Sequence, residues 1–132
     1  MVFFVTSSQS AALAEESLPV GSHPAALDTP HFPSRLHAFV WRNWPLVEPD
    51  RIAKVVGTST ENIVSIATSM GLPADVSIPP RMCERAYITV LRRNWHLLPY
   101  DQLLTLLEMT SEKLAFSLRE DDGVFWKLGD LK

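Results

Sequence analysis

The sequence predicts an all-α domain of two tandem three-helix repeats, each resembling a helix-turn-helix unit. A flexible N-terminal leader and a short C-terminal strand or arm complete the prediction. Three observations lead to this class. Apolar residues recur at helical spacing through most of the chain. The pattern of residues 34–72 returns in residues 85–123, and prolines and glycines fall between the apolar stretches.

Length and composition narrow the function classes. The chain has 132 residues, which corresponds to one domain of ordinary size. Its formal charge of −3 argues against a general electrostatic grip on nucleic acid or anionic lipid. Cys83 is the single cysteine, so an intramolecular disulfide and a cysteine-based metal cluster are both excluded.

Residues 1–33 are expected to form the flexible leader. They are rich in Ser, Ala and Pro, and a short helix near residues 11–18 is the only element they could hold. No Lys or Arg precedes Arg35, which is untypical of a signal or transit peptide. No apolar run approaches the roughly 20 residues that span a bilayer. We therefore expect a cytoplasmic protein that does not enter a membrane.

The internal repeat is the strongest signal. Residues 42–44 and residues 93–95 both read Arg-Asn-Trp, at an offset of 51 residues. An ungapped match of residues 42–63 with 93–114 contains six identities, and apolar positions pair with apolar positions. Two copies fall short of the roughly three that a solenoid needs, so the units are expected to pack on each other as a pseudo-symmetric pair.

The units are expected to hold three helices each. In residues 34–72 these helices cover 34–44, 49–57 and 58–71, with Gly57 ending the second helix and Thr58 and Glu61 forming a capping box. In residues 85–123 they cover 85–95, 99–108 and 110–121. The prolines of residues 73–84 make this segment the linker and the start of the next helix.

The end of the chain, residues 124–132, is expected to be a strand-like arm. Residues 124–128 are strong β-formers, and a glycine stands on each side of them.

The second and third helices of the first unit are typical of a helix-turn-helix. Ala53 is the small residue at a close crossing, Gly57 tolerates the turn, and Ile63 is an apolar residue after it. The second copy has Leu104 for Ala53, Glu108 for Gly57 and Met109 for Thr58. We therefore expect its turn to be built differently or to be strained.

DNA binding is the alternative function. The residues that would face DNA are Thr58, Ser59, Thr60, Asn62 and Ser65. Glu61 is the only charged residue of this third helix, and six of the eight arginines lie on or just before the first helix of a unit. This charge distribution favours packing or protein contact over DNA reading.

A candidate partner surface involves Trp41, Arg42, Arg92 and Arg93. Trp44 and Trp95 occupy matching places and are expected in the core, whereas Trp41 has Arg92 as its counterpart and is expected at the surface. Arg42 and Arg93 allow two interpretations. Either they form a shared contact with a partner, or they cap helix-end carbonyls or pair with Asp50 and Asp101.

The sequence predicts no catalytic, cofactor or metal site. No nucleophile elbow, phosphate loop or Ser/His/Asp order is visible. The histidines match no metal-ligand spacing, and the acidic run at residues 120–122 lacks the alternating oxygen ligands of a calcium loop. We therefore expect a protein that is not an enzyme.

Residues 31–44 (HFPSRLHAFVWRNW) and 87–99 (YITVLRRNWHLLP) carry a family resemblance. They resemble the N-terminal helical region of large uncharacterised bacterial proteins with downstream glycoside-hydrolase-like domains. The resemblance covers residues 31–130. It implies that any catalytic residues lie downstream of Lys132. Because the packing pattern repeats and no catalytic constellation is visible, we expect a non-catalytic interaction or accessory module, whose partner is another protein or the adjacent domain.

Overall fold

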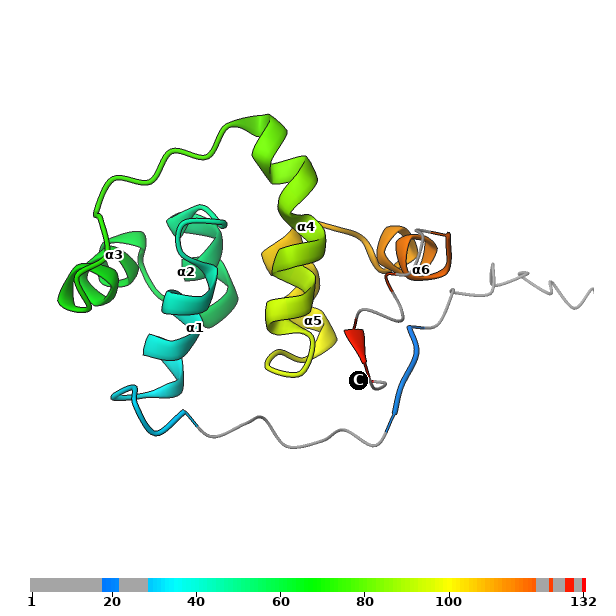
Figure 1. Cartoon of the computed structure of the whole chain (residues 1–132), viewed down its shortest axis with the longest axis horizontal. Helices are drawn as coiled ribbons and strands as arrows, with labels where there is room; N and C mark the ends of the chain where they lie inside the picture. Colours follow the sequence, from blue (N-terminus) through cyan, green and yellow to red (C-terminus); the bar gives the residue numbers. More distant parts are fainter. Residues whose placement is uncertain (1–17, 22–28, 121–123, 125–127, 130–131) are drawn as a thin grey trace, which may run out of the picture.

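The computed structural model describes residues 18–21, 29–120, 124, 128–129 and 132. These residues form six helices and no strand, so the predicted all-α class is confirmed for the described part of the chain (Figure 1). In chain order the helices are α1 (Arg35–Asn43), α2 (Pro49–Val56), α3 (Thr60–Ser69), α4 (Pro80–Asn94), α5 (Tyr100–Leu107) and α6 (Ser111–Glu120). None of the described helices is long and apolar enough to cross a membrane.

Local signals explain the bounds of α1, α2 and α3. The Ser34 hydroxyl accepts from the His37 N–H and caps α1. Pro49 begins α2, and Gly57 ends it in the left-handed conformation with φ 72°. The cap of α3 was predicted to be Thr58, and this is wrong. Ser59 is the capping residue, and its hydroxyl accepts from the Asn62 N–H.

The helices α4, α5 and α6 follow a similar order. α4 begins at Pro80, five residues before the predicted start at Arg85, because Pro80 suits a first helical position and does not interrupt the helix. α5 ends at Glu108, which is left-handed with φ 51°. The Thr110 hydroxyl accepts from the Lys113 N–H and caps α6. Thr110 lies 51 residues after Ser59, so both caps have the same place in the repeat pattern.

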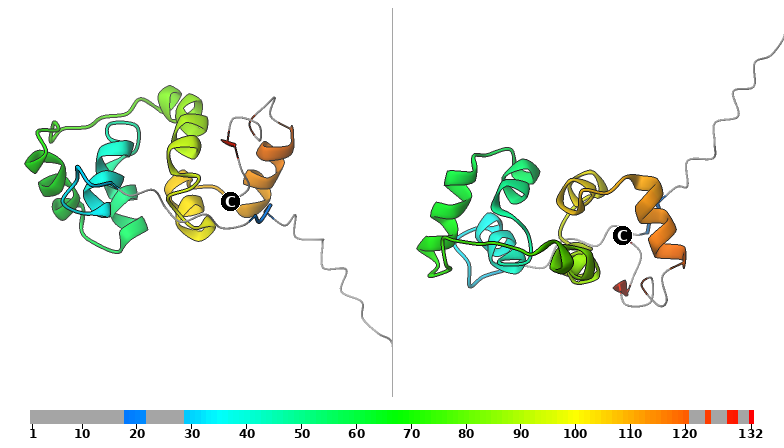
Figure 2. Two further views of the ribbon diagram at one scale, coloured as in Figure 1. Left: turned by 60° about the horizontal axis from the view of Figure 1, so that its bottom comes forward. Right: turned by 90° about the horizontal axis from the view of Figure 1, so that it is seen from above.

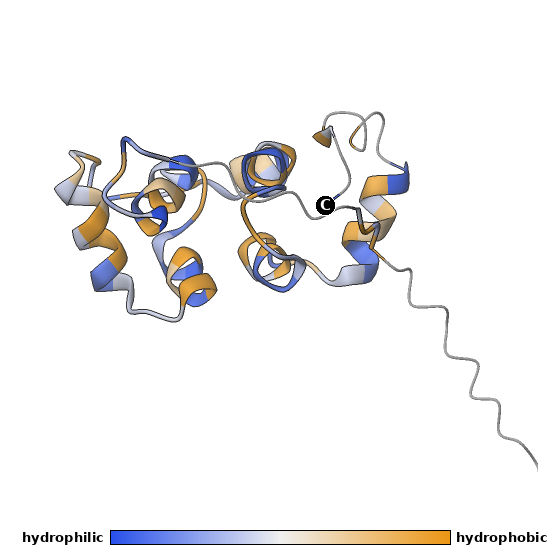
Figure 3. Cartoon of the chain, turned by 90° about the horizontal axis from the view of Figure 1, so that it is seen from below, coloured by the Kyte–Doolittle hydropathy of each residue, from blue (hydrophilic) through white to orange (hydrophobic). Residues whose placement is uncertain are grey.

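One apolar core joins α1, α2 and α3 (the first half) to α4, α5 and α6 (the second half). α2 packs on α5 and α1 packs on α4, and both contacts cross between the halves. Each helix ribbon carries apolar and polar residues (Figure 3), as expected of amphipathic helices around a core. Buried core residues recur at the 51-residue offset: Val40 and Leu91, Trp44 and Trp95, Val47 and Leu98, Ile52 and Leu103, Val55 and Leu106, Ile63 and Leu114.

The two halves differ in their third helices. α3 packs directly on α2 and α1, whereas α6 lies away from α4 and α5, with the end of the chain beside it (Figures 1 and 2). Leu114 and Leu118 of α6 are buried, and they belong to the same core cluster as Val124, Leu128 and the buried residues of the other helices. The third helix of the second half therefore joins the common core without packing closely on α4 and α5.

The predicted strand at residues 124–128 is wrong where the structure describes it. Val124 and Leu128 both have helical backbone, and both are buried. Residues 125–127 lie outside the described residues. Apolar burial at a four-residue spacing explains this outcome, because helical spacing puts both side chains on one face.

Part of the predicted leader contacts the second half. Leu18 is packed against the core cluster, and the Tyr100 hydroxyl donates to the carbonyl of Pro19. The Gly21 N–H donates to the carbonyl of Lys132 at 2.5 Å. The short helix predicted near residues 11–18 falls almost wholly outside the described residues.

Candidate functional site

The C-terminal ends of α1 and α4 meet through two buried amides. Asn43 and Asn94 are both fully buried and lie 51 residues apart. The Asn43 Nδ2 donates to Asn94 Oδ1 at 3.0 Å, and the Asn94 Nδ2 donates to Asn43 Oδ1 at 2.6 Å. Each Nδ2 also donates to the carbonyl one turn earlier, at Phe39 or Val90. Both amide hydrogens of each side chain are thereby used, which a buried polar pair requires.

The two neighbouring arginines make a second reciprocal contact. Arg42 donates through Nε and Nη2 to the carbonyl of Arg93, at 3.0 and 2.6 Å. Arg93 donates through Nη1 to the carbonyl of Arg42 at 2.6 Å. Carbonyls in the last turn of a helix have no partner within the helix, and positive charge there is favourable. Each arginine thus caps the end of the opposite helix, as one of the two sequence-based interpretations predicts.

A third reciprocal contact joins α2 and α5. Arg51 Nη1 donates to the carbonyl of Leu106 at 3.4 Å, and Gln102 Nε2 donates to the carbonyl of Val55 at 3.5 Å. Gln102 follows Arg51 by 51 residues, and Leu106 follows Val55 by the same number. The pattern at the helix ends therefore extends along the contact between the halves.

Trp41 and Arg92 remain on the surface. Trp41 is 47% exposed, as the sequence predicts, and its ring lies 6.0 Å from that of Phe32 at an angle of 59°. Trp44 and Trp95 are buried, which confirms their predicted place in the core. Arg92 is exposed and lines a shallow hollow of about 310 Å³ with Thr89 and Arg93.

The residues predicted to face DNA divide into two groups. Thr58, Ser59 and Asn62 bond to one another at the start of α3: Thr58 Oγ1 accepts from Asn62 Nδ2 at 2.9 Å, and the Ser59 hydroxyl accepts from the Asn62 N–H. Thr60 and Ser65 line a hollow of about 510 Å³ on the outer face of α3. α3 carries no basic residue in its last turn, and Glu61 is in its first turn. This face is polar and lacks cations.

The turn after α5 has Glu108 where the turn after α2 has Gly57. Thr58 N–H donates to the carbonyl of Ala53, and Met109 N–H donates to that of Leu104, both at 3.1 Å. The two turns therefore share one backbone geometry, and the second of the two predicted outcomes applies. Glu108 adopts a left-handed conformation that is strained for a residue other than glycine.

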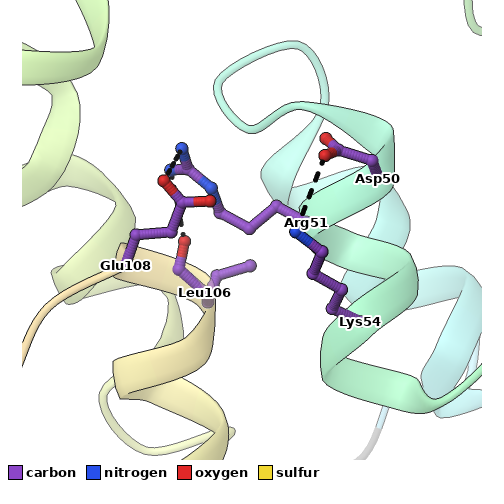
Figure 4. Close-up of polar contacts among 5 residues, drawn as sticks. All are labelled: Asp50, Arg51, Lys54, Leu106 and Glu108. Carbon is purple, nitrogen blue, oxygen red and sulfur yellow. Dashed lines mark hydrogen bonds and ion pairs between the residues drawn. The ribbon is translucent and has the colours of Figure 1, made fainter.

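Sequence reasoning missed an ion pair that this turn creates. Glu108 Oε2 lies 2.9 Å from Arg51 Nη2, across the contact between α2 and α5 (Figure 4). The substitution of Glu108 at the Gly57 position was the available signal. Arg51 itself gave none, because it is one of many charged residues on the helices.

A second cluster lies at the end of α4. The Lys132 ammonium donates to the carbonyls of Trp95 and Leu98 and stands 5.9 and 5.5 Å from the ring centres of Trp95 and Tyr100. Burial lowers the pKa of Lys132, and the charge of Asp101 opposes this shift. Burial also raises the pKa of Tyr100 to about 12. This cluster fastens the end of the chain to the second half.

Among the described residues, no group of three or more His, Cys, Asp or Glu side chains is arranged to hold a metal ion. No protein-family model, curated protein or solved structure matches the chain.

Proposed function

We propose that this chain is a non-catalytic helical interaction or accessory module, built from two tandem three-helix units and forming the N-terminal part of a larger bacterial protein. The reciprocal contacts of Asn43 with Asn94 and of Arg42 with Arg93 support the tandem arrangement. The resemblance of residues 31–130 supports the larger bacterial protein, and we propose another protein or an adjacent domain as the partner.

The exposed Trp41 is the observation that carries the proposal. A tryptophan with about half its surface in water gains more than most residues when a partner covers it. Phe32 lies beside it and enlarges the apolar area. Arg42 and Arg93 are engaged in capping, so the partner surface reduces to Trp41 and its counterpart Arg92.

Affinity capture with matched baits tests this function. The baits are the wild-type chain, the W41S/R92S variant, and a K54S/V56S variant that changes exposed residues of α2. We expect a protein that is retained by the wild-type and K54S/V56S baits and reduced at least about tenfold with W41S/R92S, since a central aromatic contact contributes about 2 kcal/mol. Equal recovery on all three baits would contradict the proposal. Circular dichroism checks that the three baits are equally folded.

A second candidate function is DNA binding by a helix-turn-helix formed from α2 and α3. The left-handed Gly57, the buried Ala53 and the cap at Ser59 favour it, because this is the turn such a motif requires. The DNA-facing residues would be Thr60 and Ser65, together with Thr58, Ser59 and Asn62. The absence of cations from the described outer face of α3 weighs against it, since phosphate contacts dominate DNA affinity.

A further inference from the structure

A cavity of about 350 Å³ lies between α4, α5 and α6, and the side chain of Arg51 forms part of its wall. Arg51 and Lys113 supply two positive charges to its wall, and Leu107 and Met109 supply apolar surface. Glu108 stands at the same wall and is paired with Arg51. The cavity exists beside α6, the helix that lies apart from its own half (Figure 2).

The guanidinium of Arg51 is incompletely bonded. Nη2 pairs with Glu108 at 2.9 Å, and Nη1 reaches the carbonyl of Leu106 at 3.4 Å, which is long for a hydrogen bond. Nε is buried, and no acceptor in the described part of the chain bonds to it. A buried N–H without an acceptor is disfavoured, so Nε is the atom of this guanidinium that has an acceptor to gain.

Glu108 pairs with Arg51 from a strained backbone conformation. It holds φ 51° at a position where the first half uses Gly57. Its side chain is 56% exposed, so the carboxylate can leave Arg51 for water with little loss, as exposed ion pairs are weak. Strained residues persist where they serve a site. A carboxylate from another molecule could therefore take the place of the Glu108 carboxylate at Arg51.

We propose that this cavity binds a carboxylate group, which displaces Glu108 into solvent, reaches Nε of Arg51 once Glu108 has left, and then accepts from Nε and Nη2 as a bidentate pair. The planar guanidinium matches a carboxylate through two parallel bonds. Lys113 adds attraction, and Leu107 and Met109 contact the methylene groups that carry the carboxylate. Glu84 also lines the cavity and disfavours ligands with several negative charges. The site is separate from Trp41, so W41S leaves it intact.

Titration by NMR tests this proposal on the whole chain, observing the Arg51 Nε–H signal. The probes are the peptide acetyl-Ala-Glu-Ala-amide, its Gln counterpart, and propionate. We expect saturable shifts with the Glu peptide and no saturation with the Gln peptide. Tighter binding of the peptide than of propionate identifies a protein side chain as the carboxylate source, and equal binding identifies a free carboxylic acid.

Two variants make the test decisive. E108Q removes the competing carboxylate and retains the side-chain shape, so the Glu peptide should bind about three- to tenfold more tightly. K54Q changes an exposed lysine on the same helix as Arg51 and should leave the affinity unchanged. The absence of saturable shifts at Arg51 in both the wild type and E108Q would overturn the proposal, as would equal affinity for the Glu and Gln peptides.

Discussion

The turn after α2 and the turn after α5 have the same backbone and different residues. Gly57 and Glu108 are both left-handed, and the caps Ser59 and Thr110 follow each by two residues. The buried apolar positions and the hydroxyl caps therefore determine the geometry, because they are the features that the turns share. The residue in the left-handed position differs between the turns, and at Glu108 the strained backbone comes with an ion pair to Arg51.

A second difference between the halves concerns the third helices. α3 is packed on α1 and α2, whereas α6 lies away from α4 and α5 (Figure 1). Residues at the 51-residue offset thus form matching helices, but the third helices of the two halves are packed differently. The cavity at Arg51 lies beside α6, in the second half.

Removal of either reciprocal amide, Asn43 or Asn94, should lower the free energy of unfolding more than any other change considered below. Asn43→Ala leaves Asn94 with an unpaired donor and acceptor in a fully buried place, so we expect a loss of about 3 kcal/mol in the free energy of unfolding. Asn94→Ala should cost the same within about 1 kcal/mol. The double variant N43A/N94A should cost less than the two single variants together, since it leaves neither amide unpaired.

Urea denaturation of the three variants measures these costs. Each single variant should lose more than about 1 kcal/mol in the free energy of unfolding. A smaller loss, or a double variant whose loss equals the sum of the two single losses, would contradict the reciprocal bonding of the two amides.

The next effect concerns the arginines that cap the opposite helices. Arg42→Gln and Arg93→Gln each remove a charged donor from a helix-end carbonyl, and we expect a loss of about 1 kcal/mol for each at their exposed positions. Arg92→Gln is the matched control and should change stability by no more than about 0.5 kcal/mol. Thermal unfolding compares the three. A control that costs as much as Arg93→Gln would contradict the capping role.

The two turns should respond in opposite directions to substitution. Gly57→Ala puts a side chain on a left-handed residue and should cost about 1 kcal/mol. Glu108→Gly relieves that strain and loses a half-exposed ion pair, for a net gain of about 0.5 kcal/mol. Glu108→Ala loses the ion pair without relief and serves as the control. A destabilised Glu108→Gly variant in urea denaturation would show that the ion pair outweighs the strain.

Tyr100 should give the second half a small dependence of stability on pH that the first half lacks. Burial raises the pKa of Tyr100 to about 12, whereas Pro49 occupies the matching position in the first half. The unfolded chain ionises this phenol near pH 10, so stability should fall as the pH rises from about 10 to 12. A Y87F variant leaves Tyr100 as the single tyrosine, and its absorbance titration measures the pKa. Ionisation near pH 10 in the folded protein would contradict the burial.

Helical periodicity was sufficient to predict the helical class and most helix bounds. Prolines and capping residues set helix ends through local contacts, and the spacing of apolar residues can be read along the chain. The sequence alone therefore predicts these features. The predicted strand at residues 124–128 fails at Val124 and Leu128 because β-propensity yields to burial in the apolar core. The ion pair of Arg51 with Glu108 and the reciprocal bonds of Asn43 and Asn94 could not be predicted, since they depend on how the halves face each other.

We propose that the likeness of α2 and α3 to a helix-turn-helix is a packing solution in a protein-contact module. Titration of the purified chain with labelled random-sequence duplex DNA, at low and at moderate salt, tests it most directly. We predict no binding at low salt, because the described outer face of α3 offers no cations to phosphates. Tight binding that falls steeply as salt rises would contradict the claim and identify the chain as a DNA-binding protein.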